Sequence, residues 1–140
     1  VAASPLSPNR VLVEHLIETT VGMVVDTSCW MGFSIYPDTK MDEHRMVRIL
    51  AERGLDRMLV NSAADWGRSD PLKTAKTGAA MLEAGFEADD VDRVLWRNPV
   101  EFYGQSGNLL LDPVPGFVEG EAPAASASFE GSSVLRGARV

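Results

Sequence analysis

Three short apolar runs set the pattern of this chain, and each is followed by polar residues and then by a segment with helical spacing. The runs are Val11–Val13, Trp30–Tyr36 and Met58–Val60. Each has the length of a buried strand, and no hairpin signal joins one run to the next. Large and small side chains alternate in the second run, which Pro37 ends. Repeated strand and helix units predict a parallel sheet with right-handed crossovers, and therefore an α/β fold.

Two helices are predicted between these strands. Apolar residues fall on one stripe from Glu43 to Arg53, where Asp42 is placed to cap the start and Gly54 to end the helix. The apolar residues of 16–26 also recur at a spacing closer to 3.6 than to 2, although β-branched residues and a glycine oppose a helix there. We therefore expect a short helix over 16–26.

Two more helices are predicted after the third strand. One begins with Asp70 as N-cap and Pro71 at the first helical position, and it ends near Ala84 before a glycine. Its stripe towards the sheet is expected to consist of Leu72, Ala75, Ala79 and Leu82. The next helix begins near Asp89 and is expected to bury Val91, Val94 and Leu95. Asn98–Pro99 is expected to break this helix before a last turn over 100–103.

The chain divides into three parts by composition. Residues 1–9 read as a loop, 10–108 form the predicted domain, and 109–140 form a largely disordered tail. Prolines, glycines and an alanine and serine run indicate that residues 113–128 lack regular structure. A length of 140 residues suits one domain with a sizeable core.

Composition and charge narrow the possible partners. The chain has 20 acidic against 13 basic residues, a net charge of −7, and no cluster of Lys and Arg, so nucleic-acid binding is not supported. No apolar run approaches the roughly 20 residues of a membrane span, so we expect a soluble protein. The single cysteine, Cys29, cannot form an internal disulfide. We expect a buried, inert thiol in a reducing, cytoplasmic compartment.

Residues that could carry chemistry follow the ends of the three predicted strands. His15 follows the first, Tyr36 and Lys40 follow the second, and Asp65 and Trp66 follow the third. Parallel α/β folds house their chemistry at this carboxyl edge. An imidazole and a carboxylate suit zinc or a similar divalent ion, and Asp65 could accept the proton of a metal-activated water. Tyr36, Lys40 and Trp66 are the candidates to contact a substrate.

Each candidate also has a structural alternative. Asp65 could cap a turn, and His15 could be a half-buried residue held by hydrogen bonds. Glu14 and Glu18 are expected to face solvent or to cap the following helix, and His44 is expected at the surface.

Three stretches resemble the C-terminal part of the TatD-related metal-dependent hydrolases, which are TIM barrels of the amidohydrolase superfamily. They are Val-Leu-Val-Glu-His15 with Glu18-Thr-Thr20, Trp30 to Pro37, and Ser62 to Pro71 with Asn98 to Phe102. The resemblance implies the sixth, seventh and eighth strands of the barrel, with His15 and Asp65 as metal ligands. The family's other ligands, a His-x-His, an acid and a further His, have no counterpart here. The resemblance thus implies a fragment, the last three βα units of a (β/α)8 barrel.

The resulting hypothesis is a fragment of a hydrolase that uses zinc or manganese to activate water. Its substrate would be a small molecule with a phosphoester, lactone or amide bond, and the fragment alone is expected to be inactive. One alternative is a non-catalytic α/β module that binds a protein partner through its acidic surface and its flexible tail. Another is a metal-dependent sugar-phosphate isomerase on the same barrel.

Overall fold

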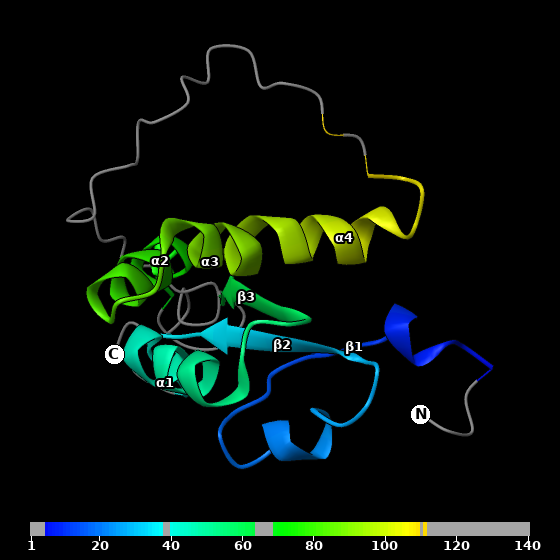
Figure 1. Ribbon diagram of the computed structural model, residues 1–140, viewed down its shortest axis with the longest axis horizontal. Coiled ribbons are helices and arrows are strands. Elements are labelled where there is room, and N and C mark those ends of the chain that lie inside the picture. The colour runs from blue at the N-terminus through cyan, green and yellow to red at the C-terminus, as the bar shows by residue number, and fades with distance from the viewer. Residues whose placement is uncertain (1–4, 38–39, 64–68, 110, 112–140) are drawn as a thin grey trace, which may run out of the picture.

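Three parallel strands form the centre of the molecule (Figure 1). The computed structural model describes residues 5–37, 40–63, 69–109 and 111, so the predicted irregular stretch 113–128 lies outside it. The strands are β1 (Leu12–Val13), β2 (Trp30–Ile35) and β3 (Met58–Ser62), in the sheet order β1-β2-β3. Both pairings are parallel, which confirms the predicted α/β class and sheet type.

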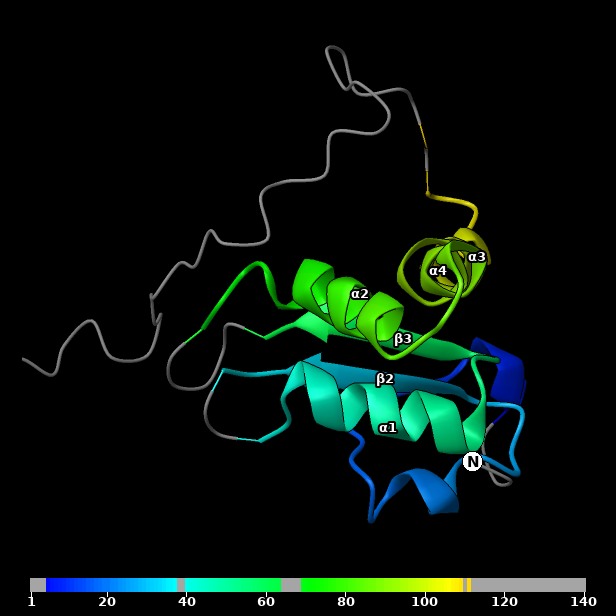
Figure 2. The ribbon, with the colours of Figure 1, turned by 60° about the vertical axis from the view of Figure 1, so that its left-hand side comes forward.

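One helical segment precedes β1, and helical segments follow each strand. In chain order they are η1 (Pro8–Arg10), η2 (Val21–Met23), α1 (Glu43–Arg53), α2 (Lys73–Glu83), α3 (Ala88–Asp92), the π-helical segment η3 (Arg93–Arg97) and α4 (Asn98–Gly104). Figure 2 shows α1 and α2 side by side along the strands. Within the described part of the chain, no helix has the length and apolar character needed to cross a membrane.

The two faces of the sheet carry different residues. On one, which we call the helical face, Met31, Phe33 and Ile35 of β2 join a core cluster with residues of α1, α2 and η3. The alternate positions define the second face: Trp30, Gly32 and Ser34 of β2, with Leu59 and Asn61 of β3. All six residues of β2 are buried, as is typical of a central parallel strand.

Helix α1 forms as predicted because its signals are local. The carboxylate of Asp42 accepts a hydrogen bond from the Arg45 N–H at 2.8 Å, which satisfies one free donor of the first turn. Gly54 ends the helix with a φ of 83°, a left-handed conformation that a side chain disfavours. The buried stripe is Met46, Val47, Ile49 and Leu50.

The helix expected over 16–26 is wrong, because the structure has turns there around the short η2. Several backbone N–H groups there, such as those of Met23, Val24 and Thr27, donate to the carbonyl three residues earlier, as in a 3₁₀ turn and not an α-helix. Threonine hydroxyls also bond to nearby backbone groups. The Thr20 hydroxyl accepts from the Ile17 N–H at 2.9 Å, and the Thr27 hydroxyl donates to the Val24 carbonyl at 2.6 Å. With the β-branched residues of this stretch, these bonds outweigh a weak helical pattern.

The predicted start of α2 is also wrong by two residues. The helix begins at Lys73 with Leu72 as its N-cap, not at Pro71. The Asp70 carboxylate accepts from the Leu72 N–H at 2.9 Å, so Asp70 forms a turn before the helix.

The predicted buried stripe of α2 is wrong as well. Leu82 is 52% exposed, and Ala75 is exposed. The residues that α2 buries are Lys73, Thr77, Gly78, Ala80 and Met81. The physical reason lies in α1, whose Glu43 binds the ammonium of Lys73 at 2.6 Å and turns that side of α2 inward.

Asn98–Pro99 does not break the last helix, contrary to the prediction. The segments α3, η3 and α4 follow one another directly, and Val94 is fully buried as expected. Proline lacks an N–H and its ring crowds the carbonyl four residues earlier. The wider π turn accommodates this, because the Asn98 N–H donates to Arg93 O, five residues back.

Candidate functional site

Those predicted site residues that the structure describes lie at or after the carboxyl ends of the strands. His15 follows β1 and is exposed. Tyr36 directly follows β2 and is buried, with its N–H donating to Met41 O at 2.9 Å. Asp65 and Trp66 lie outside the described residues.

His15 has an unusual backbone conformation. Its φ is 62°, in the left-handed region, which non-glycine residues seldom occupy. Two bonds hold this turn: the Leu16 N–H donates to Gly32 O at 3.0 Å, and the Lys40 ammonium donates to His15 O at 2.8 Å. Lys40, predicted as a substrate-contacting residue, is thus joined to the backbone of the predicted metal ligand.

The imidazole of His15 is held on the second face of the sheet. Its Nδ1 lies 3.0 Å from the hydroxyl oxygen of Ser34. When Nδ1 carries the proton and donates to Ser34, Nε2 presents its lone pair. A hydrogen bond on the other ring nitrogen is the usual arrangement for a histidine that binds a metal.

Glu14 lies over the same face. Its three carboxyl atoms are within 3.0 Å of the position that a Cβ of Gly32 would take, so only glycine leaves room for them. The carboxylate accepts from the Asn61 side chain and from the His15 N–H, both at 3.4 Å. We call Glu14, His15, Gly32, Ser34, Lys40 and Asn61 the carboxyl-end cluster.

Sequence reasoning missed the position of Glu14. The residue is exposed, but its carboxylate lies on the sheet and not at the start of a helix. The signal that could have found it is Gly32, because a glycine inside a strand often marks the close approach of another group.

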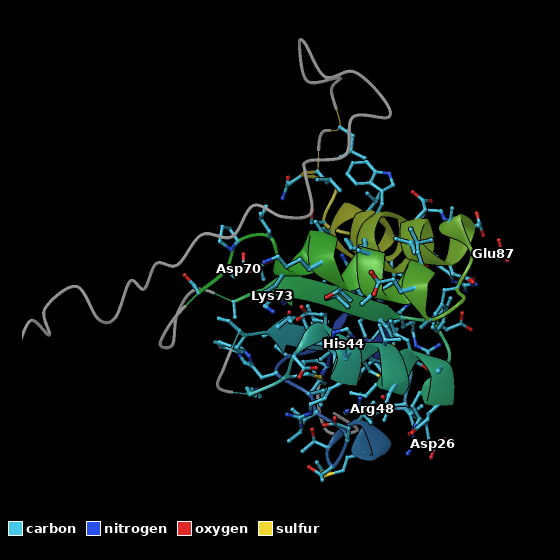
Figure 3. All side chains as sticks on the ribbon, turned by 90° about the vertical axis from the view of Figure 1, so that its left-hand side faces the viewer. Asp26, His44, Arg48, Asp70, Lys73 and Glu87 are labelled. Carbon is cyan, nitrogen blue, oxygen red and sulfur yellow. The ribbon has the colours of Figure 1, made fainter. Side chains whose placement is uncertain are left out.

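Glu18 and His44 lie outside the carboxyl-end cluster. Glu18 forms a two-point ion pair with Arg45 of α1, with contacts of 2.8 and 2.7 Å. The hydrogen bond from the Arg45 guanidinium lowers the pKa of Glu18 against the opposing effect of desolvation. His44 is exposed on α1, as predicted (Figure 3). Cys29 is fully buried, which confirms the predicted burial of its thiol.

The described donors fit a divalent metal in type but not in number. Neutral imidazole and carboxylate, here His15 and Glu14, are ligands that zinc and manganese accept. A catalytic zinc site normally has three protein ligands. Among the described residues, no group of three or more His, Cys, Asp and Glu side chains is gathered in this way.

A cavity of about 450 Å³ lies elsewhere, near the start of β1. Its lining is Arg10, Phe102, Tyr103, Gln105, Ser106, Asn108 and Leu109, none of which belongs to the carboxyl-end cluster. Phe102 also contacts the Trp30 ring, with centroids 5.6 Å apart. The cavity therefore lies towards the amino ends of the strands, opposite to the edge where parallel α/β folds place their chemistry.

No family model, curated protein or solved structure matches this chain.

Proposed function

We propose that this chain is the C-terminal part of a metal-dependent hydrolase built on a (β/α)8 barrel. The arrangement of the sheet supports the proposal. Consecutive strands are neighbours, and α1, α2 and η3 all pack on the helical face. A barrel has all of its helices on the outside, and the packing of these helices on one face fits that arrangement, which one half of a doubly wound sheet also has. The second face would then line the interior of the barrel.

The observation that carries the proposed chemistry is the position of His15. Its ring lies on this second face at the carboxyl end of β1, fixed by Ser34. We propose that His15 and Asp65 hold zinc or manganese. Such an ion supplies a nucleophile at neutral pH by lowering the pKa of water. In this proposal Asp65 accepts the proton that the nucleophile loses.

The substrate is proposed to be a small molecule with a phosphoester, lactone or amide bond. Trp66, Tyr36 and Lys40 would border it, because they follow the same carboxyl ends of the strands. The buried thiol of Cys29 is consistent with a reducing compartment, and we propose a cytoplasmic enzyme.

The test uses the full-length protein encoded by the open reading frame that contains this sequence. Wild type, His15→Asn and Asp65→Asn are stripped with a chelator, reloaded with zinc and assayed for bound metal and for hydrolysis of a p-nitrophenyl phosphodiester, a lactone and an anilide. Both variants should lose metal and activity. His44→Asn is the matched control, because His44 is exposed on α1. Equal metal content in the His15 and His44 variants would refute the proposal and favour a non-catalytic module.

A further inference from the structure

Two consecutive side chains, Glu14 and His15, reach the same face of the sheet. We infer that Glu14 is a second donor to the divalent cation that His15 binds, an inference that rests on the proposed function. Successive residues of a strand normally point to opposite faces. The left-handed turn at His15, with its φ of 62°, removes this alternation and brings the imidazole back to Ser34. A strained backbone conformation is retained where it positions functional groups, and here it pairs an imidazole with a carboxylate.

The space that Glu14 occupies is provided by a residue of another strand. Any side chain at Gly32 would overlap all three carboxyl atoms of Glu14. Gly32 has no positive φ, so its backbone geometry does not require glycine, and the group that approaches it closely is the carboxylate of Glu14. Asn61 of β3 turns its amide towards the same carboxylate. Two strands therefore accommodate one acidic group beside the histidine.

Among the described residues, the carboxylate of Glu14 has only weak partners. The two hydrogen bonds that it accepts from them fall on Oε2, and both are 3.4 Å long, whereas charge-assisted bonds are ordinarily about 2.7–2.9 Å. The carboxylates of Glu18 and Glu43 have cationic partners at 2.7 and 2.6 Å. Within the described residues Glu14 has no Lys or Arg partner, and the nearby Lys40 ammonium binds a backbone carbonyl. An exposed carboxylate on the same face of the sheet as the His15 imidazole is suited to bind a cation.

The experiment is a zinc titration by isothermal calorimetry on the protein used above. Glu14→Gln removes the charge with little change of shape, and Gly32→Ala displaces the carboxylate while leaving Glu14 in the chain. Each should weaken zinc binding at least about 10-fold, the effect of losing a group that binds or orients a metal ligand. Circular dichroism checks that each variant is folded.

Matched controls come from the same chain. Glu83→Gln changes an exposed glutamate, and Gly22→Ala changes a glycine with open space around it. The inference is overturned, and the proposed function stands, if the Glu14 and Glu83 variants bind zinc equally well while His15→Asn binds it more weakly than wild type. If His15→Asn binds zinc as tightly as wild type, or wild type binds none, both are overturned.

Discussion

Asn98 connects the last helix to the sheet, and its replacement by aspartate should destabilise the protein strongly. The side chain is buried, with 4% of its surface exposed. Its amide nitrogen donates to Leu55 O and to Met58 O, both at 2.8 Å. Asn98→Asp keeps the shape but exchanges the two donors for an oxygen that faces two carbonyl oxygens.

The magnitude follows from these two bonds. Each net hydrogen bond contributes about 1 kcal/mol, and a buried carbonyl left without a partner costs about 1–3 kcal/mol. With the burial of a charge, the loss should reach about 3–5 kcal/mol of unfolding free energy. The unfolding free energy of a small domain falls by about 2 kcal/mol for each molar of urea, so the urea concentration at the midpoint of unfolding should fall by about 2 M. Tryptophan fluorescence would follow the transition, since the chain has three tryptophans.

The matched control is Asn108→Asp, because Asn108 is exposed and undergoes the same chemical change. This variant should stay within about 0.5 kcal/mol of wild type. The difference between the two variants should also depend on pH. Burial beside two carbonyls raises the pKa of the carboxyl introduced at 98, so the difference is smallest below about pH 3.9 and grows as the pH rises through the folded-state pKa. Equal midpoints for the two variants at pH 7 would refute the assigned role of Asn98.

Three further outcomes are expected. The lowered pKa of Glu18 means that its pair with Arg45 stabilises the fold above the ordinary value of 4.5 and ceases to do so as the pH falls through the folded-state pKa. Glu18→Gln should therefore lower stability at pH 7 by under about 1 kcal/mol, since both side chains are about one-third exposed, and should match wild type in acid; a loss that persists in acid would argue against the pair. Lys73→Met alone should lower the unfolding free energy, measured in urea, by on the order of 3 kcal/mol, because it leaves Glu43 without its partner. Adding Glu43→Leu should recover most of this loss, and additive losses would contradict the coupling of the two residues. Finally, a thiol reagent should label Cys29 only in denaturant, and rapid labelling of the folded protein would contradict its burial.

The accuracy of each fold prediction depends on whether the deciding contact is local. Helix α1 was predictable because Asp42 and Gly54 act within one turn of the helix. The stripe of α2 was not, because the Lys73–Glu43 pair joins two helices through residues that are 30 positions apart in the sequence. An apolar pattern cannot reveal a lysine that is buried by its ion pair. Pro99 likewise indicates a helix break in the sequence, because the π turn that lets the helix continue can be seen only in the structure.

The candidate site could also be predicted only in part, because some of its contacts are not local in the sequence. The place of His15 at the carboxyl end of β1 follows from the apolar run before it, and that part was predictable. Strand alternation, however, assigns Glu14 and His15 to opposite faces, and the left-handed φ of His15 reverses this. That conformation depends on Gly32 O and on Lys40, which are 17 and 25 residues away in the sequence. The bond of Lys40 to His15 and its proposed contact with substrate can therefore be tested separately. If its contribution is to hold His15, Lys40→Met should weaken zinc binding as well as turnover, whereas a residue that only contacts substrate would alter KM and leave zinc affinity unchanged.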